Sequence, residues 1–417
     1  MSLTIIEKII SNHSGQQVKP GEIVWMNLDL VSARDFGGPN VVKHYRREYD
    51  DARVFDASRV VFTFDLCVPA CTLKYADNQQ VCREFARQQG FRVFDVDQGI
   101  GSHVMIEQGL AGPGKTVVGT DSHLNILGAV GCFGQGMGDV DITFSFRTGR
   151  TWFEVPSTVM VQVKGQPSTL ATPKDLTLFL CKSLGTKKVA LKAVEFYGEA
   201  VRALSLDGRI TLCSMVTEMA GIVGFVPELN EAVQAKMMAL PCFDLKNWIA
   251  SDQGAQYEEI IEVDVSGLGP QVAVPYLPHQ VRDIEEVQGT KIDTGFIGSC
   301  TNGRGEDFRQ AAQILKGQKI KEGVTLKCVP ATRQVYRQLL EEGILESLIN
   351  SGAIVSNPGC GGCAEGHVGL TGEGEVQIST GNRNFYGKQG KGKTYLASPA
   401  VVAASCLAGE IISPEEI

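Results

Sequence analysis

Two cysteines that lie two residues apart in a glycine-rich turn constrain this chain more than any other feature. Cys360 and Cys363 enclose two glycines, and Cys300 follows Gly298 on another glycine-flanked turn about sixty residues upstream. Glycines let the backbone approach an inorganic core where a side chain would collide. Three converging thiolates suit an iron–sulfur cluster, because soft sulfur ligands select such clusters or zinc. The Cys-x-x-Cys pair alone is weak evidence, since a redox dithiol or half of a zinc site has the same spacing.

The composition is that of an ordinary globular protein. At 417 residues the chain is long enough for roughly three domains, with 43% apolar and 21% charged residues. The formal net charge of −8 disfavours nonspecific binding to nucleic acid or to an anionic membrane. An anionic substrate would therefore have to be held by a few local cations.

Twelve cysteines raise the question of disulfides, but the sequence favours the reducing cytoplasm. The chain starts without a charged-then-apolar signal segment and has no apolar run long enough to span a membrane. We therefore expect most cysteines to be small buried side chains. For Cys67, Cys71 and Cys82, which are close in sequence, core filling is favoured over a second metal site.

Helical and strand patterns alternate along the chain, which predicts α/β layers with largely parallel sheets. We divide the chain into three domains, 1–158, 159–287 and 288–417, and read the Pro- and Gly-rich residues 264–290 as a linker. Thr172 followed by proline predicts the start of a helix. We expect helices over 3–12, 78–89, 102–108 and 306–315, and strands over 21–30, 60–66, 91–96, 116–119 and 294–297.

The segment Gly109–Thr116 fits the P-loop spacing G-x-x-x-x-G-K-[ST], which would indicate a nucleotide hydrolase. A P-loop follows a strand and opens a helix, so that the helix N-terminus meets the phosphate. Here a helical pattern precedes the glycines and a strand pattern follows them. We therefore favour a tight helix-to-strand turn.

Several polar residues are candidates for chemistry. Asp121, Ser122 and His123 follow a predicted strand, at the end where open α/β sheets bind ligands. Glu218 lies in an apolar stretch, where an ionised carboxylate is costly unless it is paired. A solvent-facing position on a helix is the alternative for Glu218.

Taken in order, the motifs resemble those of the aconitase superfamily over nearly the whole chain. They are Gly119–His123, Gly298–Arg304, Cys360–Cys363, Ser379–Phe385 and Ala397–Ser405. The stretch Cys300–Arg304 looks most like the large subunits of isopropylmalate isomerase and homoaconitase.

The resemblance implies three α/β/α domains around a central iron–sulfur site, without the fourth, swivelling domain. Cys300, Cys360 and Cys363 would hold a [4Fe–4S] cluster with one labile iron. The implied reaction is dehydration and rehydration of a hydroxy-di- or tricarboxylate. A Lewis acid suits this chemistry because hydroxide is a poor leaving group. His367 would be a fourth ligand by spacing alone, and the family does not use it so.

The family's functional residues carry over motif by motif. Asp121 and His123 would orient groups around the cluster, and Ser122 would contact substrate. His103 would pair with a carboxylate and help handle the leaving hydroxyl, and Glu218 would lie near the iron-bound water.

The remaining carried-over residues are cations and amides. Arg383 would clamp a substrate carboxylate, a task suited to the planar guanidinium. Arg304 is a second possible contact to substrate or small subunit, and Asn302 and Asn382 would lie beside the cluster. The alternative for His103 and His123 is that they are hydrogen-bonded core histidines, and the alternative for Arg383 is a surface ion pair.

Two departures from the family pattern point to altered specificity. The family's early Asp-His pair is Asp65 followed by Leu66 here, and leucine can neither donate nor accept a proton. At position 388 the family has an arginine that would bind a substrate carboxylate. This sequence has Lys388 there, which keeps the positive charge but lacks the planar guanidinium group. A catalytically silent relative with a structural or iron-sensing metal centre is the alternative.

The family's catalytic base is a serine on the swivelling domain, which this sequence lacks. The resemblance therefore implies a separate small subunit of the swivel type and an inactive large chain alone. Isopropylmalate, homocitrate, citramalate and dimethylmalate types of substrate stay open.

Overall fold

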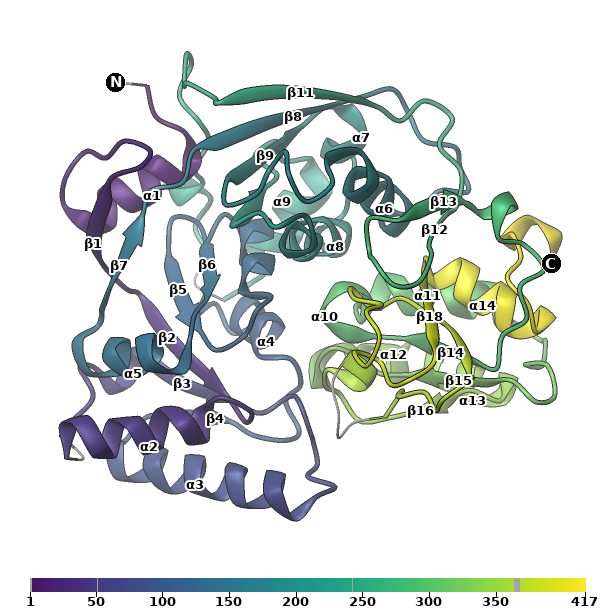
Figure 1. Ribbon diagram of the computed structural model, residues 1–417, viewed down its shortest axis with the longest axis horizontal. Helices are drawn as coiled ribbons and strands as arrows, with labels where there is room; N and C mark the ends of the chain where they lie inside the picture. The colour runs from purple at the N-terminus through teal and green to yellow at the C-terminus, as the bar shows by residue number, and fades with distance from the viewer. Residues whose placement is uncertain (1, 51, 242, 364–367) are drawn as a thin grey trace.

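The computed structural model describes residues 2–50, 52–241, 243–363 and 368–417. Within these residues the strands form three larger sheets and one two-stranded ribbon (Figure 1). Parallel pairing dominates the three larger sheets, as the alternating patterns predicted. None of the described helices combines the length and the apolar character needed to cross a membrane.

The first sheet is wholly parallel, in the order β4-β3-β2-β5-β6. Every residue of its inner strand β3 is buried, which fits a strand covered on both faces. Helices α2, α3 and α5 pack outside it (Figure 1). The elements are β2 (Leu30–Arg34), α2 (Gly38–Tyr49), β3 (Val60–Thr63), α3 (Leu73–Gln89), β4 (Arg92–Phe94), α4 (Gly101–Glu107), β5 (Thr116–Gly119), β6 (Phe133–Gly136) and α5 (Asp139–Thr148).

The second sheet is also parallel, in the order β10-β9-β8-β11. Thr172 caps α6 through a capping box with Asp175, and Pro173 opens the helix, which confirms the predicted helix start. The elements are β8 (Thr158–Lys164), α6 (Pro173–Leu184), β9 (Ala193–Tyr197), α7 (Glu199–Arg202), α8 (Leu206–Met215), β10 (Val223–Phe225), α9 (Glu231–Met238) and β11 (Glu259–Asp264).

The third sheet has the order β13-β12-β18-β17-β14-β15-β16, with five parallel strands and an antiparallel edge. The strands are β12 (Gln271–Ala273), β13 (Val281–Asp283), β14 (Thr294–Ile297), β15 (Thr325–Cys328), β16 (Ile354–Val355), β17 (Val376–Ser379) and β18 (Lys393–Leu396). The helices are α10 (Ser299–Asn302), α11 (Gly305–Leu315), α12 (Arg333–Glu341), α13 (Ile344–Ser351) and α14 (Pro399–Ala408).

Two predictions were wrong. The stretch 264–290 is more than a linker, because β12 and β13 within it form the edge of the third sheet. The strand predicted over 21–30 is two strands, β1 (Ile23–Asn27) and β2, in different sheets. β1 pairs antiparallel with β7 (Arg150–Glu154), whereas β2 turns into the first sheet. A local apolar pattern does not reveal which strand its segment will pair with.

The other predicted elements lie where expected, with shifts of a few residues at their ends. The N-terminal helix α1 spans Ile5–Ser14, and α3 begins five residues before the predicted helix at Asn78. The strands of the three larger sheets come from residues 30–136, 158–264 and 271–396. The domain limits themselves stay a prediction.

Gly109–Thr116 forms a turn between α4 and β5, as favoured above. Gly109 and Gly114 adopt left-handed conformations with φ of 67° and 74°. The Lys115 ammonium donates to the carbonyls of Gly109 and Leu110 at 3.1 and 3.2 Å. This lysine therefore closes its own loop, and the loop leads into strand β5 rather than into the helix that a P-loop opens.

Candidate functional site

Most of the predicted site residues lie where loops of the first sheet approach the third sheet. Parallel strands end at one edge, so the loops after β2, β3 and β5 lie together there. The loop after β14 approaches the same edge from the third sheet. His103 on α4 connects the two, because its Nε2 donates to the Cys300 carbonyl on α10 at 2.9 Å.

The turns that carry the cysteines are shaped around Phe296 of β14. A Cβ on Gly361, whose φ is 63°, would lie 2.5 Å from the Phe296 ring. A Cβ on Gly298 would lie 2.6 Å from the Val329 carbonyl oxygen. Only glycine fits at either place, so both turns can fold tightly against one buried ring.

Hydrogen-bond donors point at two of the cysteine sulfurs. Asn382 Nδ2 donates to Cys300 Sγ at 3.2 Å, and its Oδ1 lies 4.0 Å from Cys363 Sγ. Arg34 donates to Cys360 Sγ at 2.8 Å. Burial raises the pKa values of the Cys300 and Cys360 thiols, so ionisation there needs positive charge nearby.

This donor set fits an iron–sulfur cluster, because thiolates are the usual ligands of such clusters and neighbouring side chains donate hydrogen bonds to the Cys300 and Cys360 sulfurs. Hydrogen bonds to the sulfurs are also typical of cluster sites. His367, the fourth ligand suggested by spacing, lies outside the described residues.

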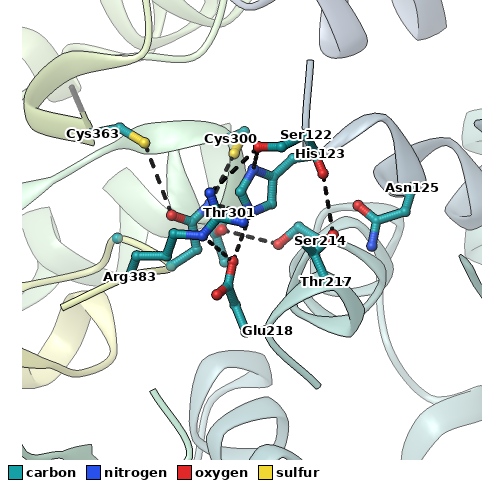
Figure 2. Close-up of polar contacts among 12 residues, drawn as sticks. Ser122, His123, Asn125, Ser214, Thr217, Glu218, Cys300, Thr301, Cys363 and Arg383 are labelled. Carbon is teal, nitrogen blue, oxygen red and sulfur yellow. Dashed lines mark hydrogen bonds and ion pairs between the residues drawn. The ribbon is translucent and has the colours of Figure 1, made fainter. Parts of the chain in front are cut away.

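Beside the sulfurs, four polar side chains form one network (Figure 2). Glu218 Oε1 lies 2.9 Å from His123 Nε2 and accepts from Arg383 Nε at 2.7 Å. Ser122 Oγ lies 3.2 Å from His123 Nδ1 and 3.4 Å from the Arg383 guanidinium. Glu218 is therefore buried and paired, and the alternative of a solvent-facing position is wrong.

Asp121 and His103 contact the segments that carry His123 and Cys300, respectively. Asp121 accepts from the His123 backbone N–H at 3.1 Å, and the Arg34 charge lowers its pKa although burial opposes this. Burial and the Arg304 charge lower the pKa of His103 to about 3, so this imidazole is neutral. Its partner is the Cys300 carbonyl, where a carboxylate had been expected, and its Nδ1 has no partner among the described residues.

The sequence reasoning missed Arg34, the last residue of β2. Its Nε donates to Asp65 at 2.6 Å and one terminal nitrogen donates to Asp121 at 3.1 Å, while the other contacts Cys360. Its place at a strand end beside an acidic residue was the available signal.

Lys174, on the first turn of α6, was also missed. It is fully buried, and its ammonium donates to the carbonyls of Thr380 and Gly381 at 3.0 and 2.8 Å. Burial lowers its pKa to about 8. These carbonyls directly precede Asn382 and Arg383. Lys174 therefore restrains the loop whose side chains contact Cys300 and Glu218. From the sequence alone, Lys174 cannot be distinguished from an ordinary residue at the start of a helix.

Three predicted residues lie apart from this network. The Asn302 amide donates to Thr211 and Asp307, beside α11. Arg304 is buried in ion pairs with Glu107 at 2.6 Å and Asp207 at 3.3 Å. That geometry favours a structural role for Arg304. The Lys388 side chain is half-buried and has no ion pair or hydrogen bond among the described residues.

Comparison with known proteins places this arrangement among relatives. The profile of the Aconitase family (aconitate hydratase) matches residues 7–409. The 3-isopropylmalate dehydratase large subunit 1 of Archaeoglobus fulgidus is 41% identical over 421 residues, covering 100% of both chains. The probable methanogen homoaconitase large subunit of Methanothermobacter thermautotrophicus is 39% identical over 423 residues, covering 100% of this chain and 98% of its own.

Among solved structures, aconitase X of Thermococcus kodakaraensis in its holo-form has a similar fold. The TM-score is 0.55 with 14% sequence identity, over 86% of this chain and 84% of that chain. At this identity the likeness concerns the fold alone.

We predict that replacing Arg34 with methionine destabilises the protein by about 3–5 kcal/mol, because it leaves Asp65 and Asp121 buried without their cation. Urea unfolding measures the change. Arg47→Met is the matched control, because Arg47 is exposed on α2, and it should shift stability by less than about 0.5 kcal/mol. Equal stability of the two variants would contradict the inferred role of Arg34.

We predict that Lys174→Met loosens the loop 379–390. Two buried carbonyls lose their donor, at about 1–3 kcal/mol each. Hydrogen exchange of the loop amides should accelerate, while Lys182→Met, an exposed site on the same helix, should leave it unchanged. Unaltered exchange in Lys174→Met would show that other contacts hold the loop.

Proposed function

Because this chain belongs to the aconitase family, we propose that it is the large catalytic subunit of an aconitase-type hydro-lyase. The substrate class is a 2- or 3-hydroxy di- or tricarboxylate of the isopropylmalate, homoaconitate or dimethylmalate type. The observation that carries the proposal is the Glu218–His123–Arg383 network beside three cysteines on glycine-shaped turns.

Cys300, Cys360 and Cys363 are the proposed cluster ligands. When bound, a [4Fe–4S] cluster with one labile iron would supply a Lewis acid for departure of the substrate hydroxyl. Arg34 and Asn382 favour the thiolate form by donating to Cys360 and Cys300. Asn382 also lies 3.0 Å from His123 Nε2, so it joins the proposed ligand Cys300 to the polar network.

The cations beside the network would hold the anionic substrate. Arg383 is partly exposed and now donates to Glu218 and Ser122, so a substrate carboxylate can replace the weaker Ser122 contact at 3.4 Å. Lys388 follows on the same loop and has its ammonium available. Charge that develops beside the substrate carboxylate is stabilised by such fixed cations.

Glu218 and His123 are the proposed proton-handling pair. The 2.9 Å contact allows a proton to pass between them, and Asp121 fixes the His123 backbone. Asp65 would act by holding Arg34 and the α4 N-terminus, since its Oδ2 accepts from Gly101 N–H at 2.8 Å.

Leu66, which stands where the family has a histidine, is the reason we expect a different substrate from that of the family. It is buried next to Asp65, where a histidine would offer a proton donor. Leucine can neither donate nor accept a proton, so we expect the substrate to differ from that of relatives with histidine here. This supports altered specificity over a silent paralogue, because the Glu218 network is complete.

The relatives' designation as large subunits supports a small-subunit partner, and the proposed partner carries the catalytic serine. The proposed compartment is the cytoplasm, which is supported by the absence of disulfides among the described cysteines. Leucine biosynthesis is the proposed pathway for an isopropylmalate substrate.

We predict that the purified, iron-reconstituted chain is inactive alone and turns over a hydroxyacid once a swivel-type small subunit is added. Formation of the unsaturated acid, followed by its absorbance, measures this. Full turnover by the chain alone would refute the need for a partner. An anaerobic cluster spectrum that no candidate hydroxyacid perturbs would favour the silent paralogue.

We further predict that Glu218→Gln lowers kcat of the two-subunit enzyme about 10²–10⁴-fold, because the amide cannot exchange a proton with His123. The visible absorption of the cluster should not change, since no contact between Glu218 and Cys300, Cys360 or Cys363 occurs among the described residues. Glu199→Gln, at an exposed site on α7, is the control. Wild-type kcat in Glu218→Gln would remove Glu218 from the mechanism.

A further inference from the structure

Two thiols outside the proposed cluster site meet in the loop between β3 and α3. The sulfurs of Cys67 and Cys71 lie 3.5 Å apart, and the Cys71 N–H donates to Cys67 Sγ at 3.4 Å. Neither forms a disulfide. Cys67 is fully buried, whereas Cys71 is exposed. Core filling therefore describes Cys67 and Cys82 but not Cys71.

The contact has the geometry of a dithiol that is ready to close. A disulfide bond is about 2.05 Å long, so the sulfurs need to approach by only about 1.5 Å. The Cys67 backbone is anchored, because its N–H donates to buried Asp35 at 3.2 Å. Residues 69–71 are at least partly exposed, and they can supply the movement.

The same loop touches the segment that carries Cys360. The Asp65 carbonyl accepts from the Cys360 N–H at 2.9 Å, and the Val68 carbonyl accepts from the Asn357 amide. A change at Cys67 and Cys71 therefore acts on a loop that is bonded directly to the 357–360 segment.

We propose that Cys67 and Cys71 form a reversible redox-modification site whose oxidant is a low-molecular-weight disulfide such as glutathione disulfide. Cys71 loses its proton to solvent, and its thiolate attacks one sulfur of the oxidant, breaking the S–S bond and expelling one glutathione thiolate. Cys67 gives its proton to that thiolate and attacks the Cys71 sulfur, which breaks the mixed disulfide and expels the second glutathione thiolate. The second thiolate takes up the proton that Cys71 released, so the products are the Cys67–Cys71 disulfide and two molecules of glutathione.

The difference in solvent exposure between Cys71 and Cys67 determines which thiol reacts first. Only Cys71 is open to an oxidant the size of glutathione disulfide, and Cys67 is placed to resolve the adduct. Closure would draw residues 69–71 toward Cys67 and disturb the Val68–Asn357 contact. The site is independent of the proposed hydro-lyase activity, and its test does not require turnover.

The test treats the protein, isolated anaerobically with its own metal content, with glutathione disulfide, followed by alkylation and peptide mapping. Wild type should yield a peptide in which Cys67 and Cys71 have lost two hydrogens, and dithiothreitol should restore both thiols. Cys67→Ser should instead accumulate a glutathione adduct on Cys71. Cys71→Ser should form neither product, because Cys67 is buried.

Cys82→Ser is the matched control, since Cys82 is buried on the following helix and should leave the closure unchanged. Circular dichroism verifies that each variant is folded. A stable glutathione adduct on wild-type Cys71 without closure would overturn the proposal. Oxidation that maps to Cys300, Cys360 or Cys363 while Cys67 and Cys71 stay reduced would also overturn it.

Discussion

The guanidinium of Arg34 is the interaction on which the site depends. It joins carboxylates at the ends of β3 and β5 to a cysteine of the third sheet. The Arg34 guanidinium and an ionised carboxylate would each be costly to bury alone, by several kcal/mol. All three contacts of Arg34 can form only when the loops of the first and third sheets lie together as they do here. Electrostatic compensation thus positions the Cys360 loop against the loops that hold Asp121 and His123.

The opposite side of the site is held by shape and by a second buried cation. Phe296 fills the space that the glycines leave open, so the Cys300 and Cys360 turns share one ring. Lys174 binds the carbonyls ahead of Asn382 and Arg383 from beneath the loop. The proposed site residues lie on loops at strand ends, and buried groups restrict the movement of these loops. Such preorganisation is what fixed electrostatic stabilisation of a reacting anion requires.

Local patterns predicted much of the fold. The strands at 116–119 and 294–297 and the start of α6 agree with the sequence signals, because short buried runs and helix caps are encoded within a few residues. The strand at 21–30 and the linker at 264–290 failed because strand pairing is decided by distant partners. Arg304 and Asn302 were predicted as site residues because they lie in family motifs. In the structure Arg304 contacts Asp207, and Asn302 contacts Thr211.

The sequence by itself determined the α/β class, the glycine turns around the three cysteines and the polar triplet at 121–123, since spacing and residue type encode these locally. Only the tertiary structure decided that Arg34 and Lys174 belong to the site and that Cys67 meets Cys71. The physical reason is distance along the chain: Arg34 and Cys360 are 326 residues apart, and a buried charge selects its partner only after the sheets have packed.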